Sequence, residues 1–122
     1  MAWALNADRP IYAQLVDRIQ LQIVAGQLNP GEKILSVREL AAEAAVNPNT
    51  MQKALAELER KGLLYSQRTS GRFVTEDREL IGNVKEEMAA EQISAFLENM
   101  KQLGFNKKET IRIIEKLEEE RE

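Results

Sequence analysis

Two helix-start signals lie close together near the middle of the chain, and their spacing constrains the fold more than any other feature. In "SVRE", Ser36 and Glu39 have the spacing of a capping box, in which each side chain bonds to the backbone N–H of the other residue. In "VNPNT", Asn47 is a favoured N-cap and Pro48 suits the first helical position. The sequence therefore predicts a short helix joined to a second helix by a tight turn.

Apolar spacing indicates which side of each helix is buried. The apolar residues recur at helical spacing and are Val37, Leu40, Ala41 and Ala44 in the first helix and Met51, Ala54, Leu55 and Leu58 in the second. Gly62 is a natural C-terminal stop for the second helix. Upstream, Pro10 suits the first turn of another helix, whose apolar face begins at Tyr12 and ends at Ile23.

Two short stretches after Gly62 predict a β-hairpin. Residues 63–67 and 72–75 suit strands, and "RTSG" between them suits a hairpin turn. An earlier stretch, "KIL", suits a lone strand. Together these elements predict a mainly α fold that starts with a winged helix-turn-helix of three helices plus a two-stranded wing.

The chain changes character after residue 76. A long helical pattern ends at Gly104, and Asn106 and Glu109 then resemble a second capping box. The final helix that they open is expected to bury Ile111, Ile114 and Leu117. We therefore divide the chain into a winged helix-turn-helix domain over 1–76 and a helical region over 77–122.

Two helices alone make a thin core, so the helical region is expected to associate with a second copy of the chain. Its apolar residues would form the contact between the two copies. The residues expected in this dimerisation surface are Ile81, Val84, Met88, Phe96, Met100, Ile111 and Ile114. A small-ligand groove is the alternative for the methionines and Phe96, but apolar stripes at helical spacing are more often core or dimer seam.

Composition excludes several classes of function. The chain has no cysteine and no histidine, which removes disulfides, thiol nucleophiles, the usual zinc ligands and imidazole catalysis. We therefore expect no metal site, no cofactor and no enzymatic activity. No apolar run approaches the roughly 20 residues that span a bilayer, and the N-terminus lacks a signal-peptide pattern. The expected location is the cytoplasm, without membrane association.

Charge is distributed unevenly along the chain. The formal net charge is −3, but residues 46–75 carry a net +3 and residues 79–122 a net −4. Local sign governs binding to a polyanion, because salt screens exposed charges beyond a Debye length of about 8 Å. The negative total therefore does not exclude nucleic acid as a partner.

The polar side of the helix that starts at Pro48 has no acid in its first two turns. It presents Asn49, Gln52 and Lys53. Amide side chains can pair with adenine and lysine with guanine in the major groove, so these residues are expected to read bases. Thr50 is expected to contact phosphate. For Asn47, helix capping is the favoured role and DNA contact the alternative.

The turn of the predicted hairpin is also suited to DNA. Gly71 permits a positive φ, and arginines and hydroxyls can contact phosphate or the minor groove. The wing residues expected to touch DNA are Arg68, Thr69, Ser70, Gly71 and Arg72. An exposed hairpin with incidental arginines is the alternative.

The stretch "LNPGEKILSVRELAAEAAVNPNTMQKALAELERKGLLYSQRTSGRFV" resembles the N-terminal domain of the GntR family of bacterial transcription regulators. The resemblance extends from about Pro10 to Thr75. "PIYAQL", "VNPNT" and a tail of only two helices are similar to the small YtrA-type subfamily. This resemblance implies a dimeric repressor, often of transporter genes, whose C-terminal helices form the dimer contact.

The resemblance also adds a site residue. Arg38 in "SVREL" matches an arginine that contacts DNA in family members. A surface charge held by a helix ion pair is the alternative, although no acid stands three or four residues ahead. Leu35 departs from the proline that members usually have before this motif, with little functional effect expected.

These observations favour a sequence-specific, DNA-binding transcription regulator. We expect a dimeric repressor that binds an inverted-repeat operator in double-stranded DNA, for transporter genes and its own operon. The alternative is a winged-helix protein-interaction module without specific DNA binding. The sequence assigns no operator sequence and no small-molecule effector.

Overall fold

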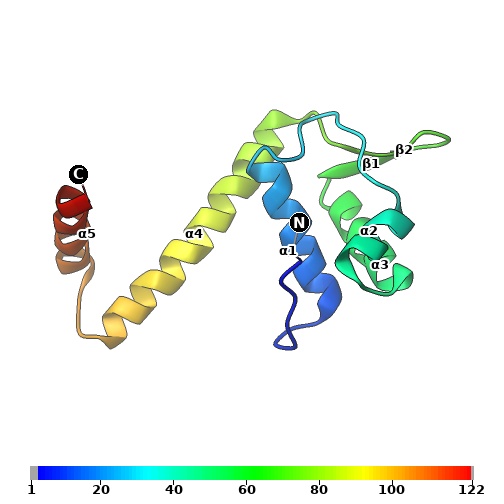
Figure 1. The fold of residues 1–122 in the computed structure, drawn as a ribbon. Helices are drawn as coiled ribbons and strands as arrows, with labels where there is room; N and C mark the ends of the chain where they lie inside the picture. The colour runs from blue at the N-terminus through cyan, green and yellow to red at the C-terminus, as the bar shows by residue number, and fades with distance from the viewer. Residues whose placement is uncertain (1–2, 122) are drawn as a thin grey trace. The chain divides into compact units, whose positions relative to one another are not determined.

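The computed structural model describes residues 3–121, which form five helices and one two-stranded sheet (Figure 1). In chain order the elements are α1 (Ile11–Val24), α2 (Val37–Ala44), α3 (Pro48–Arg60), β1 (Leu64–Gln67), β2 (Gly71–Val74), α4 (Arg78–Gln102) and α5 (Lys107–Arg121). The chain forms two compact units, of which one ends at Val84 and the other begins at Lys85. No helix within the described range is both long enough and apolar enough to cross a membrane.

The first unit is built on the packing of α1 and α2 against α3. The apolar faces predicted for these helices form one core with the hairpin. Its fully buried members include Leu15, Ile19, Ile23, Met51, Leu55, Leu58, Leu63, Leu64 and Val74. Each large aliphatic side chain buried in this way contributes about 1.5–3 kcal/mol, so the three helices and the wing stabilise one another.

Both predicted helix starts are confirmed. The Ser36 hydroxyl accepts a hydrogen bond from the Glu39 N–H at 3.2 Å, and the Glu39 carboxylate accepts one from the Ser36 N–H at 3.0 Å. Asn47 caps α3 with its side-chain oxygen, and Pro48 is the first helical residue. Between the helices, Ala45 adopts the left-handed conformation with φ 57°, which reverses the chain direction in very few residues.

The hairpin is antiparallel, with Ser66 opposite Arg72 and Gln67 opposite Gly71. Its strands differ by one residue from those expected, since β1 begins at Leu64 and β2 covers Gly71–Val74. Gly62 ends α3 with φ 82°, as predicted. The expected lone strand at "KIL" is reduced to a single bridge between Lys33 and Phe73.

The first turns of α4 belong to the first unit, whereas the sequence placed the boundary at residue 76. Leu80, Ile81 and Val84 are half-buried and pack on the core of the winged helix. Leu80 also lies close to the glycine that follows α3. A Cβ added at Gly62 would be 3.3 Å from the Leu80 Cδ2. The apolar character of Ile81 and Val84 thus has a partner within the chain, and their expected role in dimerisation stays a prediction.

The second unit consists of the rest of α4 together with α5. The predicted start of the final helix is confirmed by two hydrogen bonds between Asn106 and Glu109, at 2.8 and 3.0 Å. The expectation that α5 buries its apolar residues is wrong for the single chain. Ile111, Ile114 and Leu117 are 44%, 42% and 52% exposed, because no other part of this unit covers them.

Candidate nucleic-acid interface

Helix α3 presents the polar face that its sequence predicts. Asn49, Gln52 and Lys53 are exposed, while Met51 and Leu55 on the opposite side are fully buried. The first turn contains no acidic residue. The start of α3 therefore offers amide and ammonium groups to a ligand, with no carboxylate in its first turn to repel phosphate.

Asn47 and Thr50 lie at the start of the same helix. The Asn47 side-chain oxygen accepts a hydrogen bond from the Asn49 N–H at 2.7 Å, so the favoured capping role is confirmed. Thr50 is half-buried beside the exposed face. Four backbone N–H groups at a helix start lack helical acceptors, and one of them is satisfied here by Asn47.

Lys53 has a defined partner on another helix. Its ammonium nitrogen lies 3.9 Å from the centroid of the Tyr12 ring. Tyr12, which the sequence predicts at the start of the apolar face of α1, thus has its ring beside the lysine of α3. The attraction between a cation and an aromatic face restrains Lys53 at the rim of the polar surface.

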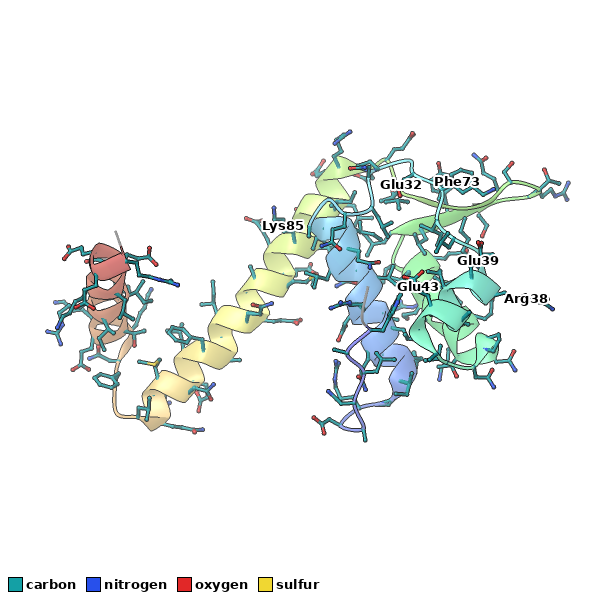
Figure 2. All side chains as sticks on the ribbon, in the orientation of Figure 1. Glu32, Arg38, Glu39, Glu43, Phe73 and Lys85 are labelled. Carbon is teal, nitrogen blue, oxygen red and sulfur yellow. The ribbon has the colours of Figure 1, made fainter. Side chains whose placement is uncertain are left out.

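Arg38 lies in the first turn of α2 and is exposed. Figure 2 shows its side chain extending away from the helix, in a different direction from Glu43. Within residues 3–121, no carboxylate forms an ion pair with it. The alternative of a surface charge held by a helix ion pair therefore lacks its expected partner.

The wing protrudes from the first unit (Figure 1). Its turn is closed by a hydrogen bond from the Ser70 N–H to the Gln67 carbonyl at 3.1 Å, and Gly71 has the predicted positive φ, at 104°. The turn residues Arg68, Thr69 and Ser70 are all exposed. Two hydroxyls and one guanidinium are thus available at the tip for phosphate or groove contacts.

Arg72 differs from the other wing residues. Its side chain is only 20% exposed, and its Nε lies 2.6 Å from the Glu59 carboxylate of α3. Ser66 donates a hydrogen bond to the same carboxylate oxygen at 2.5 Å. These two bonds, from Ser66 first and then Arg72, lower the pKa of Glu59 below its ordinary value of 4.5 in spite of partial burial. The structure therefore places the Arg72 side chain against α3, one residue pair before the turn of the wing.

A groove of about 740 Å³ separates the wing from the start of α2. It is lined by Lys33, Ile34, Leu35, Ser36, Val37 and Glu39 on one side and by residues 66–72 on the other. Lys33 was not predicted as a site residue, although it lies beside the wing, with its Cε 3.1 Å from where a Cβ at Gly71 would be. The only signal in the sequence was the expected strand at "KIL".

Three packed helices, a tight turn between the second and third, and a protruding hairpin define a winged helix-turn-helix protein of the DNA-binding class. The chain belongs to the family described as bacterial regulatory proteins, gntR family, whose model matches residues 11–74. Members of this family are non-enzymatic, DNA-binding transcriptional regulators, so the predicted resemblance and the predicted lack of enzymatic activity are both confirmed.

Two curated relatives from Bacillus subtilis strain 168 are similar over most of the chain. The uncharacterized HTH-type transcriptional regulator YhcF is 38% identical over 106 residues, which cover 87% of this chain and 88% of the relative. The HTH-type transcriptional repressor YtrA is 35% identical over 98 residues, which cover 80% of this chain and 71% of the relative.

Solved structures show the same fold. A GntR family transcriptional regulator from Listeria monocytogenes matches with a TM-score of 0.85 and 39% identity, covering 92% of this chain and 98% of the other. The DNA-binding domain of AraR, solved in complex with operator ORX1, matches with a TM-score of 0.55 and 33% identity, covering 58% of this chain and 92% of the other.

Proposed function

We propose that the protein is a homodimeric transcriptional repressor that binds an inverted-repeat operator. The exposed polar face at the start of α3, whose first turn carries no acid, is the observation that carries this proposal. It lies in the unit that also bears the exposed Arg38 and the wing, and all three features suit one duplex. The AraR domain solved on operator DNA shares this fold and supports the same use of the surface.

The contacts fall into two classes. Asn49, Gln52 and Lys53 specify the sequence by bonding to base edges in the major groove. The residues that mainly position the protein on the phosphate backbone are Arg38, Thr50, Arg68, Thr69, Ser70 and Gly71. Asn47 contributes through the helix cap, and Arg72 through its bond to the end of α3.

Dimerisation is proposed to use α4 and α5. Six large apolar side chains of the second unit are exposed: Ile93, Phe96, Leu103, Ile111, Ile114 and Leu117. Monomeric proteins rarely leave so much apolar surface in contact with water, and a second copy of the same helices would cover it. Met88 and Met100, which are half-buried, would lie in the same seam. A two-fold symmetric dimer matches an inverted repeat.

The regulatory outcome is proposed from the relatives. YtrA, which is 35% identical, is named a transcriptional repressor, and this supports repression by the present protein. Its targets are proposed to be transporter genes and its own operon, as the resemblance to the YtrA-type subfamily implies. The proposed action on genomic DNA supports the expected location in the cytoplasm.

The test is a fluorescence-anisotropy titration against the gene's own upstream DNA and a scrambled duplex, at two salt concentrations. Tighter binding to the upstream duplex is expected. If each subunit neutralises roughly 3–5 phosphates, log affinity should fall with log salt at a slope of about −0.9 per phosphate neutralised. Gln52→Ala should reduce discrimination between the duplexes about tenfold, since a good bidentate base contact contributes about 1–3 kcal/mol.

Gln27→Ala is the matched control, because Gln27 is also exposed but lies after α1, away from α3. It should leave both the affinity and the discrimination unchanged. Absence of binding at low salt would reject the proposal and favour the protein-interaction module. Equal, weak binding to both duplexes would reject autoregulation and direct the search to other promoters.

A further inference from the structure

A single carboxylate of α3 holds both strands of the wing. Glu59 lies near the end of the helix and accepts hydrogen bonds from the Ser66 hydroxyl of β1, at 2.5 Å, and from the Arg72 Nε of β2, at 2.6 Å. Ser66 and Arg72 stand directly opposite each other in the hairpin. Glu59 therefore bonds to both members of one cross-strand pair and connects the two strands to α3.

The hairpin has other attachments, since its apolar side chains pack in the core of the first unit. Backbone bonds tie β2 to the loop before α2, from the Ile34 N–H to the Arg72 carbonyl and from the Val74 N–H to the Glu32 carbonyl. These bonds hold the hairpin on the side of α2. Within residues 3–121, both side-chain hydrogen bonds that join the hairpin to α3 end on Glu59.

A neighbouring glutamate on the same helix behaves differently. Glu57 bonds to Arg60, one turn further along α3, and the Arg60 side chain is 72% exposed. This pair joins two residues of the same helix and does not connect α3 to the hairpin. The two acids of α3 are thus equal in charge but differ in what they connect.

We infer that Glu59 is a positioning residue that sets the orientation of the wing relative to α3, by means of its bonds to Ser66 and Arg72. This inference rests on the proposed function, because the oriented tip at residues 68–71 would meet the DNA while α3 reads it. A two-stranded hairpin alone is marginally stable in water, and the Ser66–Arg72 pair stands just before the turn, so a contact with α3 at this level restrains the tip. Arg72 accordingly acts through Glu59.

Simple electrostatics gives the opposite prediction, which makes the inference testable. Removal of an acid near a DNA-binding surface should strengthen binding to a polyanion. If Glu59 only adds negative charge, Glu59→Gln should bind the upstream duplex more tightly, as should Glu57→Gln. If Glu59 positions the wing, Glu59→Gln should weaken binding about three- to tenfold, the range expected for a partly exposed hydrogen-bonded charge pair. Glu57→Gln is the matched control and should not weaken it.

A second measurement reads the wing without DNA. Backbone ¹⁵N relaxation of the full-length protein should show lower order parameters for residues 68–71 in Glu59→Gln, and wild-type values in Glu57→Gln. Ser66→Ala, which removes one of the two bonds without a change in charge, should give an intermediate result in both assays. If a thermal melt shows that Glu59→Gln does not fold, Ser66→Ala still tests the inference.

The outcomes separate this inference from the proposed function. Unchanged order parameters in Glu59→Gln and Ser66→Ala would overturn the inference, whatever the DNA result. A loosened wing with unchanged or tighter DNA binding would overturn its link to recognition while the proposed function stands. If the wild type binds no duplex, the proposed function fails and the wing has no DNA to be positioned on, although the relaxation data would still show whether Glu59 restrains it.

Discussion

The ammonium nitrogen of Lys53 lies 3.9 Å from the centroid of the Tyr12 ring. This contact connects the polar face of α3 to the first turn of α1, two elements whose buried sides also pack together. A long lysine side chain loses conformational entropy when it binds a ligand, and a partner in the free protein reduces that loss. The proposed base contact is thus partly ordered before DNA arrives.

The Tyr12–Lys53 contact should be measurable in the free protein. A double-mutant cycle with Tyr12→Leu and Lys53→Met is expected to give a coupling free energy of about 0.5–1 kcal/mol in urea unfolding, the range for cation–π pairs at partly exposed sites. Tyr12→Phe is the control, because it keeps the ring and should retain the coupling. Additive effects of Tyr12→Leu and Lys53→Met would show that the contact contributes nothing to stability.

Replacement of Ala45 by glycine should stabilise the helix-turn-helix. Ala45 has φ 57° in the turn between α2 and α3, a conformation that costs an L-residue about 1–2 kcal/mol and glycine almost nothing. After the larger entropy of glycine in the unfolded chain is included, Ala45→Gly should raise the free energy of unfolding by about 0.5–1 kcal/mol.

Replacement of Ala42 by glycine, three residues earlier, should lower the free energy of unfolding. Ala42 is exposed and lies inside α2, where glycine costs about 1 kcal/mol relative to alanine. Urea unfolding of Ala45→Gly and Ala42→Gly would compare the two. A loss of stability in both variants would mean that the turn does not hold Ala45 in the left-handed conformation in solution.

Acid should weaken the start of α2 through Glu39. Hydrogen bonds from the backbone and side chain of Ser36 lower the pKa of Glu39 below its ordinary value of 4.5. A carboxyl whose pKa is depressed by folding stabilises the folded state above the unfolded pKa, and this contribution is lost as pH falls through the folded pKa. Stability measured by urea unfolding should therefore decline below about pH 4.5, in part because of Glu39.

Two variants isolate the contribution of Glu39. Glu39→Gln can still accept the Ser36 N–H but does not titrate, so its stability should fall less steeply below pH 4.5 than that of the wild type. Ser36→Ala removes one of the two hydrogen bonds that depress the pKa and should give a slope between the other two. If the free energy of unfolding fell equally steeply below pH 4.5 in the wild type and in Glu39→Gln, Glu39 would not contribute to the loss of stability in acid.

A charge placed among the exposed apolar residues of α5 should dissociate the proposed dimer. Ile114 is 42% exposed in the single chain, and an unpaired carboxylate buried at this position in a dimer would be costly. Ile114→Glu is expected to weaken self-association about tenfold or more in sedimentation equilibrium. Lys116→Glu, which introduces the same side chain at a polar position of α5, is the control.

The two possible failures of this experiment have different meanings. A monomeric wild type at micromolar concentration would reject the proposed dimer. A wild-type dimer that survives Ile114→Glu would retain the dimer but move its contact away from Ile114, toward the exposed part of α4 that carries Ile93 and Phe96.

The sequence by itself determined the local structure of the winged helix. The capping box at Ser36, the N-cap at Asn47 and the stop at Gly62 were each predicted and each formed. Their hydrogen bonds join residues at most a few positions apart, so residue type and spacing are sufficient to specify them. The exposed face of α3 followed in the same way, because helical periodicity fixes which side chains oppose a buried stripe.

Only the tertiary structure decided which distant residues meet. The sequence predicts Arg72 as a DNA contact of the wing, but its guanidinium bonds to Glu59. It predicts Tyr12 only as part of an apolar helix face, and the ring also lies beside Lys53. The same holds for Ile81 and Val84, whose apolar side chains fit a dimer seam in the sequence but pack on the core in the structure. Such contacts depend on how helices and hairpin dock, and docking is set by the packing of the whole core, which no local spacing encodes.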